Sequence, residues 1–524
     1  MQQESAMQQE TTLSRRTFVA AAGATAVALA TSAPAAPARA DETAYTCDLV
    51  VVGAGMAGIS ACLEAVDQGL SVVLVEAASM LGGTLFGTEG MFGLGSQIHI
   101  DQSTELPTKL ELVNEELAFS NYRTDPLLWG DVFDAAGDDV DWLMGKGAIV
   151  ERVDNYLGQS AYDTFHWWDG GNGATTAMAL GETVTAGGVT VLLSTTATAL
   201  KVADGRVCGV TAQAEDGSTV EIAAKAVVLA CGGMANNLEL LGEKAGMDLS
   251  TSVSLFPGCN VGDGQRLALA AGAKETPVCM MNVFTVKGYT ATDPISVGAT
   301  LQPTALIVNG DGDRFMQEDL QITKFFALVS NSWSAQDDVF CVFDAAFAGR
   351  METEGCICGV AAVHAGDLLE GFAAQLDEAA ATEDPDVFKA DTVEELAEAA
   401  GIDPARLTAT VARYNSLVAA GADEDFGKDP QYLTATVEQG PFYAVRPSYA
   451  VFASIGGVAV DRSMRVVDEA GAPIAGLYSA GTTSCGLYKE TYCYAVSGGM
   501  NAYCCYSGRT AARTAAAELA ELAE

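Results

Sequence analysis

The run GAGMAG at residues 53–58, followed by the carboxylate of Glu76, has the residue types and spacing that bind a dinucleotide. Gly53 permits a tight turn, Gly55 lets the backbone approach a pyrophosphate, and Gly58 allows a helix to pack closely against a strand. Glu76 can accept hydrogen bonds from ribose hydroxyls. The chemistry predicted from these residues is the binding of a nucleotide cofactor.

Two apolar runs and a helical pattern are expected to position these residues. Residues 47–52 and 71–75 predict strands, and apolar residues recur at helical spacing between them. Met56 and Ala57 fall at the start of the helix, where N–H groups and the positive end of the helix dipole face phosphates. A strand–turn–helix–strand unit is therefore predicted.

A second glycine-rich stretch follows Glu76 directly and bears on which dinucleotide is bound. Gly82, Gly83 and Thr84 open this stretch, and Gly87 and Gly90 continue it. A second loop of this kind suits a flavin lying extended across the sheet edge better than a nicotinamide. The predicted cofactor is FAD.

The first 40 residues have the pattern of an export signal. Residues 14–19 read SRRTFV, an apolar run extends to about residue 30, and residues 38–40 read ARA. The apolar run is too short for a bilayer about 30 Å thick, so we expect no stable membrane span. The prediction is a twin-arginine signal peptide over residues 1–40 and a periplasmic or other extracytoplasmic, cell-surface location.

Charge and cysteine content exclude further classes. Lys and Arg total 27 against 68 Asp and Glu, for a net charge of −41, which argues against nucleic-acid binding. The 13 cysteines are an odd number without ferredoxin spacing, so a complete disulfide framework is excluded and an iron–sulfur cluster from distant cysteines stays open. The isolated histidines predict no metal site: His99, His166 and His364.

Several further motifs follow along the chain: VVLACGG at 227–233, GDG at 262–264, GDRFMQE at 312–318, GGVAVD at 456–461, GLYSAG at 476–481 and a glycine pair at 498–499. These motifs resemble those of the FAD-dependent fumarate reductase/succinate dehydrogenase flavoprotein superfamily. They occur in the family's order and cover nearly the whole chain after the signal.

The resemblance implies an α/β fold: a Rossmann-like FAD-binding domain of the GR2-type flavoproteins, with an inserted α+β capping domain. The FAD-binding domain is expected over 45–270 and 445–524, and the capping domain over 271–444. Residues 191–231 predict short strands, and 392–420 predict two helices, the second starting at Asp403-Pro404. The Ala-rich tail 511–524 predicts a solvated helix.

The resemblance also implies which residues of this chain contact the flavin. The resemblance places Ala57 and Glu76 at the phosphates and ribose, and Thr84 beside the ring. Ala197 corresponds to a residue whose backbone holds the adenine. The remaining contacts lie in the GDG turn, near the ribityl chain and at the closing glycine pair: Asp263, Gly481, Thr482, Gly498 and Gly499.

The family's reaction adds a hydride and a proton across a C=C bond conjugated to a carbonyl group. The Arg of the family's TRD triplet is missing here, leaving Arg314 and Lys324 as cationic candidates. The family's carboxylate-binding His and its NRLGGNA segment are also absent, which argues against fumarate as substrate.

The C-terminal segment looks more like the 3-ketosteroid dehydrogenase branch, in which a Tyr donates to a ketone oxygen. Tyr492 occupies that place. The pattern with its export signal also resembles the digoxin (cardiac glycoside) reductase group.

The sequence thus predicts an exported FAD-dependent reductase of an enone, enoate or unsaturated lactone, with electrons from an external carrier such as a membrane-associated cytochrome. A flavin-dependent ketosteroid dehydrogenase and a catalytically dead flavin-binding protein remain alternatives.

Overall fold

The computed structural model describes residues 43–102, 105–156, 162–256, 258–323, 332–360, 363–488 and 495–523. The chain divides into two units at Asp41, and everything described belongs to the second, Glu42–Glu524. The predicted signal peptide lies outside the described residues. Among the described helices, none is both long and apolar enough to cross a bilayer.

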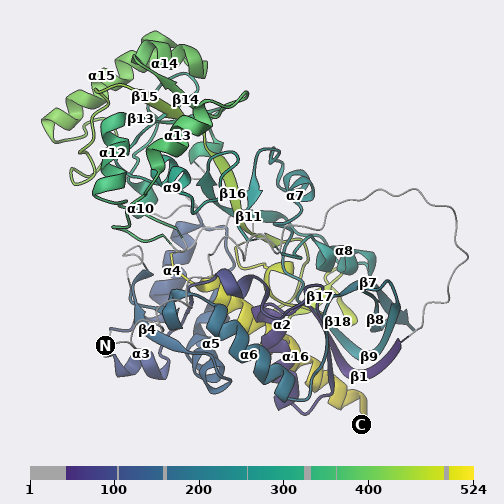
Figure 1. The fold of residues 1–524 in the computed structure, drawn as a ribbon. Helices are drawn as coiled ribbons and strands as arrows, with labels where there is room; N and C mark the ends of the chain where they lie inside the picture. The colour runs from purple at the N-terminus through teal and green to yellow at the C-terminus, as the bar shows by residue number, and fades with distance from the viewer. Residues whose placement is uncertain are drawn as a thin grey trace, which may run out of the picture. The chain divides into compact units, whose positions relative to one another are not determined.

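A largely parallel sheet carries the glycine-rich turn. Its strand order is β17-β18-β9-β1-β2-β6, and β7 and β8 join it antiparallel through β9 (Figure 1). The facing segments 49–52, 72–75 and 226–229 of the three central strands are continuously apolar and buried, as expected where a sheet is covered on both faces. The strands are β1 (Thr43–Val52), β2 (Val72–Val75), β6 (Thr190–Leu192), β7 (Thr195–Ala203), β8 (Arg206–Ala214), β9 (Thr219–Leu229), β17 (Arg465–Val467) and β18 (Pro473–Ser479).

Helix α2 (Met56–Asp67) follows β1 and packs along the C-terminal helix α16 (Gly499–Ala523). The helices approach closely, because a Cβ added at Gly508 would lie 2.2 Å from the carbonyl oxygen of Ala57. Ala511, Ala512 and Ala515 are buried. The expectation of a solvated tail is therefore wrong for the first turns after residue 510, where small side chains allow this packing.

The other elements outside the predicted capping segment include a separate three-stranded sheet with the order β3-β5-β4. The elements are η1 (Gly83–Gly87), β3 (Gly90–Phe92), α3 (Gln97–Asp101), α4 (Lys109–Phe119), α5 (Pro126–Gly145), β4 (Val150–Asp154), β5 (Phe165–Trp168), η3 (Asp169–Gly171), α6 (Ala174–Ala186), α7 (Leu238–Ala245), α8 (Asp263–Ala270) and η4 (Gly481–Thr483).

Two smaller sheets, β10-β16-β11 and β12-β13-β15-β14, involve the segment predicted to be a capping domain, although β10 and β16 lie outside 271–444. The predicted helices are present as α14 and α15, and the Asp403 side chain caps α15. The domain boundaries at 270 and 444 stay a prediction. The elements are β10 (Val253–Ser254), β11 (Val278–Thr285), α9 (Pro294–Thr300), β12 (Leu306–Asn309), α10 (Leu320–Thr323), β13 (Val339–Asp344), α12 (Ala345–Thr353), α13 (Phe372–Ala380), β14 (Val387–Ala390), α14 (Val393–Ala400), α15 (Pro404–Ala420), β15 (Phe442–Val445) and β16 (Ser448–Gly456).

Candidate active site

The turn between β1 and α2 has the geometry that its glycines predict. Gly53 has a φ of +100°, which favours glycine, and a Cβ there would lie 2.3 Å from the carbonyl oxygen of Ala230. A Cβ at Gly58 would lie 1.8 Å from the carbonyl oxygen of Gly53. At Gly55 a Cβ would meet no protein atom within 4 Å. Gly53 and Gly58 therefore shape the turn, whereas Gly55 leaves open space beside it.

The carboxylate of Glu76 is fixed next to this turn. Its Oε2 accepts a 2.6 Å hydrogen bond from the Ala54 N–H, and its Oε1 accepts a 2.7 Å bond from the Ala78 N–H. Burial raises the pKa of Glu76 above its ordinary value, because the backbone hydrogen bonds only partly offset desolvation. Glu76 thus ties the end of β2 to the start of α2 while it lines the cavity described next.

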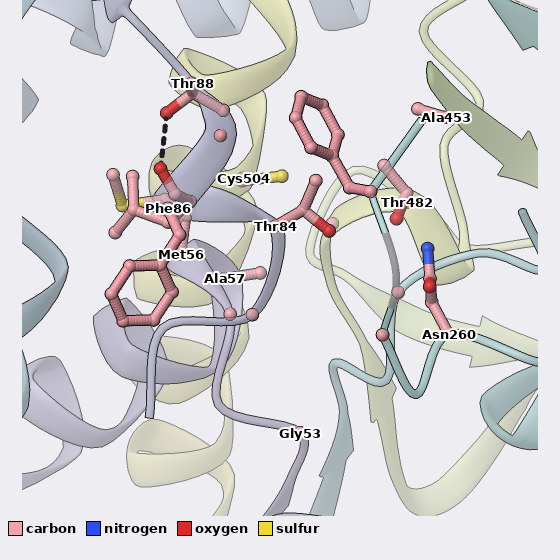
Figure 2. A pocket seen from close by; sticks show the side chains of 18 of the residues that line it. Gly53, Met56, Ala57, Thr84, Phe86, Thr88, Asn260, Ala453, Thr482 and Cys504 are labelled. Carbon is pink, nitrogen blue, oxygen red and sulfur yellow. Dashed lines mark hydrogen bonds between the residues drawn. The ribbon is translucent and has the colours of Figure 1, made fainter. Parts of the chain in front are cut away.

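A cavity of about 490 Å³ opens in front of the turn. Figure 2 shows Gly53 toward one end of the view, Thr88 and Ala453 toward the other, and Thr84 and Thr482 between them. Twelve of the fifteen predicted cofactor residues line it: Gly53, Gly55, Met56, Ala57, Glu76, Gly83, Thr84, Ala197, Asp263, Gly481, Thr482 and Gly498.

The other three predicted glycines, Gly58, Gly82 and Gly499, do not line the cavity but allow close packing next to it. As at Gly58, an added Cβ would clash at the other two positions: at Gly82 it would lie 2.4 Å from the ring of Phe86, and at Gly499 it would lie 2.9 Å from Trp129. The Gly82 N–H donates a 2.8 Å hydrogen bond to the Ala54 carbonyl. These three glycines therefore allow the helices and the loop behind the cavity wall to pack closely.

The end of the cavity away from the turn is mainly apolar. Its side chains come from the loop after β10, from β11 and β16, and from the edge of the β3-β5-β4 sheet. Among the described lining residues there are three carboxylates, Glu76, Glu89 and Asp263, and no Lys, Arg or His. The larger apolar residues that line the cavity as a whole are Phe86, Phe165, Leu255, Phe256, Met281, Val283, Val360, Phe452 and Met500.

Glu89 and Tyr156 form a polar pair in this wall, and the sequence reasoning singled out neither. The Tyr156 hydroxyl donates a hydrogen bond to Oε2 of Glu89, and both residues line the cavity. The partners are 67 positions apart in the chain. No local sequence pattern joins them, so only the folded structure could have found the pair.

Arg314, a predicted catalytic residue, is not among the cavity-lining residues. Its guanidinium donates to Glu318 at 2.8 and 2.7 Å and to Asp423 at 3.0 and 2.7 Å. The Lys428 ammonium lies 3.3 Å from Glu318 and donates to the Tyr414 hydroxyl at 2.8 Å. All five side chains are largely buried. The structure gives Arg314 two structural partners.

The other two predicted catalytic residues, Lys324 and Tyr492, lie outside the described residues. Described residues resume three positions after Tyr492, at Ala495. The N–H groups of Ala495 and Val496 each donate a 2.8 Å hydrogen bond to Glu116 on α4. Burial raises the pKa of Glu116 to about 8. Glu116 therefore anchors the backbone that leads to the cavity-lining residues Ser497 and Gly498.

The described cysteines give no support for an iron–sulfur cluster. All of them are free thiols, and within the described ranges no three His, Cys, Asp or Glu side chains gather as metal ligands. Burial raises the pKa of the Cys358 thiol to about 12, whereas cluster ligands are thiolates.

Three structural observations fit FAD. The N-terminus of α2 opens into the cavity beside Gly55, where a Cβ would enter open space. Glu76 lies within reach of a ribose in the same cavity, and the Ala197 backbone lines it further along. These positions match the contacts predicted for pyrophosphate, ribose and adenine.

Comparison with known proteins decides the family. A family model described as an FAD binding domain matches residues 48–495. The chain belongs to this family. It is also 34% identical to the vinyl phenol reductase of Lactiplantibacillus plantarum over 90% of this chain and 96% of that protein.

Solved structures agree in fold. An open conformation of a flavocytochrome c3 fumarate reductase matches with a TM-score of 0.66 at 25% identity, covering 90% of this chain and 78% of that one. A 3-ketosteroid Δ1-dehydrogenase from Sterolibacterium denitrificans matches with a TM-score of 0.68 at 21% identity, covering 90% of this chain and 100% of that one.

These findings confirm the predicted flavoprotein superfamily, the α/β fold and the FAD cofactor. The protein is an FAD-dependent oxidoreductase of the group that reduces C=C bonds.

Proposed function

We propose that this enzyme reduces a C=C bond in a neutral, largely apolar substrate, where the bond is conjugated to a carbonyl group or to a phenol ring. The apolar end of the cavity carries this proposal, because its described lining offers no cation to hold a carboxylate substrate. The relative named vinyl phenol reductase supports an uncharged substrate.

The described residues have distinct roles in this reaction. Reduced FAD, when bound, supplies the hydride. The glycine turn, Glu76 and the Ala197 backbone hold the nucleotide part. The aromatic and aliphatic side chains at the other end bury the substrate and exclude water, which strengthens every polar contact made there.

Export and electron supply complete the proposal. The twin-arginine pattern at residues 14–19 supports translocation of the folded, flavin-loaded protein. Electrons then come from a separate carrier outside the cytoplasm, such as a membrane-associated cytochrome.

The test is anaerobic reoxidation of photoreduced holoprotein by a panel of acceptors: 4-vinylphenol, a cyclic enone, an unsaturated steroid lactone and fumarate. We expect rapid reoxidation by at least one neutral acceptor and slow reoxidation by fumarate. Fumarate as the best acceptor would contradict the proposed neutral substrate.

Two further outcomes would replace the proposal. Dye reduction by a saturated 3-ketosteroid, without enone reduction, would identify a dehydrogenase. Failure of every acceptor, with normal flavin content, would leave a flavin-binding protein without this activity. Ferricyanide is the control, because it oxidises reduced flavin without any C–H bond forming.

A further inference from the structure

The Glu89–Tyr156 pair occupies a distinctive position in the cavity wall. Glu89 lies between η1, whose Gly83 and Thr84 line the cavity, and β3. Tyr156 follows β4, and its hydroxyl donates to Oε2 of Glu89. Both side chains are half-buried, so the pair is shielded from bulk water but still faces the cavity.

The other two carboxylates in the described lining are already engaged. Glu76 accepts two backbone hydrogen bonds at the nucleotide turn. Asp263, at the start of α8, pairs with Arg266 at 3.1 Å. Glu89 differs because the partner of its carboxyl is a neutral phenol, and no cation or N–H group in the described part of the chain is bonded to that carboxyl.

The surroundings of the pair favour the protonated form of the Glu89 carboxyl. The Tyr156 ring packs on Phe165 and Trp167, with centroid distances of 4.7 and 5.4 Å. Burial raises the pKa of Glu89, and this effect exceeds the opposing effects of the Tyr156 hydrogen bond and the charge of His364. A raised pKa makes a carboxyl better suited to donate a proton than an exposed carboxyl at the same pH.

We propose that Glu89 is the general acid that completes the reduction, and that Tyr156 is the positioning residue that orients its carboxyl. This inference rests on the proposed C=C reduction. The π bond breaks, one alkene carbon forms a C–H bond with the hydride from the reduced cofactor, and the other forms a C–H bond with the Glu89 proton. The resulting carboxylate regains its proton from water.

The titratable groups near the pair are few in the described structure. His364, from the loop after α12, lowers the pKa of Glu89, and Cys358 raises the pKa of Tyr156 together with Glu89. His364 itself is exposed and lies 3.7 Å from Asp367. The hydrogen bond from Tyr156 lowers the pKa of Glu89, so removing the hydroxyl should raise that pKa further.

The experiment compares Glu89→Gln and Tyr156→Phe with the wild type and with Glu151→Gln, an exposed carboxylate on β4. Photoreduced holoproteins are mixed with the best neutral alkene and, separately, with ferricyanide. We expect Glu89→Gln to slow alkene reoxidation about 100-fold or more, with flavin content and the ferricyanide rate unchanged. Glu151→Gln should match the wild type.

The pH profile separates the two roles. The wild-type alkene rate should fall as the pH rises through the raised pKa of Glu89, because the acid form is the active one. This fall should vanish in Glu89→Gln and move to higher pH in Tyr156→Phe. Infrared difference spectra should show a protonated carboxyl band that Glu89→Gln lacks.

Each result has a distinct meaning. Wild type that no alkene reoxidises refutes the proposed function itself. Wild type that turns over, with Glu89→Gln equally fast, refutes the assignment of Glu89 alone. An unshifted pH profile in Tyr156→Phe, or equal losses of alkene and ferricyanide rates, would also overturn the roles given to the pair.

Discussion

Replacing Arg314 by methionine tests whether this residue serves the fold or the reaction. The change removes the shared partner of Glu318 and Asp423, whose side chains are both fully buried. Breaking a buried pair by removing one partner costs about 3–5 kcal/mol. The Lys428 ammonium, 3.3 Å from Glu318, still compensates one carboxylate, so we expect the lower end, about 3 kcal/mol.

The pH dependence of this loss has a definite sign. Burial alone would raise the pKa of Asp423, but hydrogen bonds from Arg314 and from backbone N–H groups hold it below its ordinary value. A depressed carboxyl pKa contributes stability above the unfolded pKa of about 3.9, and this stability is lost in acid. Arg314→Met should therefore lose less stability than the wild type as the solution is acidified.

The assay is urea unfolding followed by tryptophan fluorescence, with alkene reoxidation measured per bound flavin. Arg406→Gln is the matched control, since it removes a cation from an exposed pair with Asp313 in the same region and should barely shift the midpoint. We expect a large shift for Arg314→Met and near-normal turnover per flavin. Unchanged stability with abolished turnover would refute the structural reading.

The remaining predictions concern the turn, the C-terminal loop and the residue beyond the described ranges. Gly55→Ala should preserve the fold of the apoprotein yet weaken FAD binding, whereas Gly58→Ala should weaken both, as thermal melting and flavin content will show; equal behaviour would contradict the cavity geometry. Glu116→Ala should destabilise the protein by about 1–3 kcal/mol. Burial raises the pKa of Glu116 in the folded protein, so the wild type should lose stability as the pH rises from about 4.5 to about 8. Glu116→Gln should remove this pH dependence of the urea unfolding midpoint. Tyr492→Phe should lower turnover more than flavin content, and equal losses in both would make it structural.

The nucleotide half of the site was predictable because its signals are local. A buried strand, three spaced glycines and an acid after the next strand all lie between residues 47 and 76, so sequence spacing fixes their placement. The structure agrees with the close packing expected at Gly53 and Gly58, since a Cβ at either position would clash with neighbouring backbone atoms.

The substrate half was not predictable, because its contacts join distant segments. Glu89 meets Tyr156 across 67 positions, and Glu116 reaches Val496 across 380. Neither carboxylate stands in a motif, and an acidic residue on a predicted helix or loop is ordinarily solvated. Arg314 shows the converse: a motif drew attention to it, and only the folded structure reveals that Asp423, 109 positions away, joins it in a buried ion cluster.

The shortage of cations bears directly on substrate selection. The chain has 27 Lys and Arg against 68 Asp and Glu, and buried cations in the described structure are engaged by carboxylates: Arg314 and Lys428 in one cluster, and Arg509 with Glu64 and Asp139 in another. A dicarboxylate entering the cavity would find no described cation lining the wall. Unpaired charges in a site of low polarity disfavour binding strongly. A neutral substrate avoids that penalty and gains from the apolar wall, so discrimination against anions requires no dedicated contact.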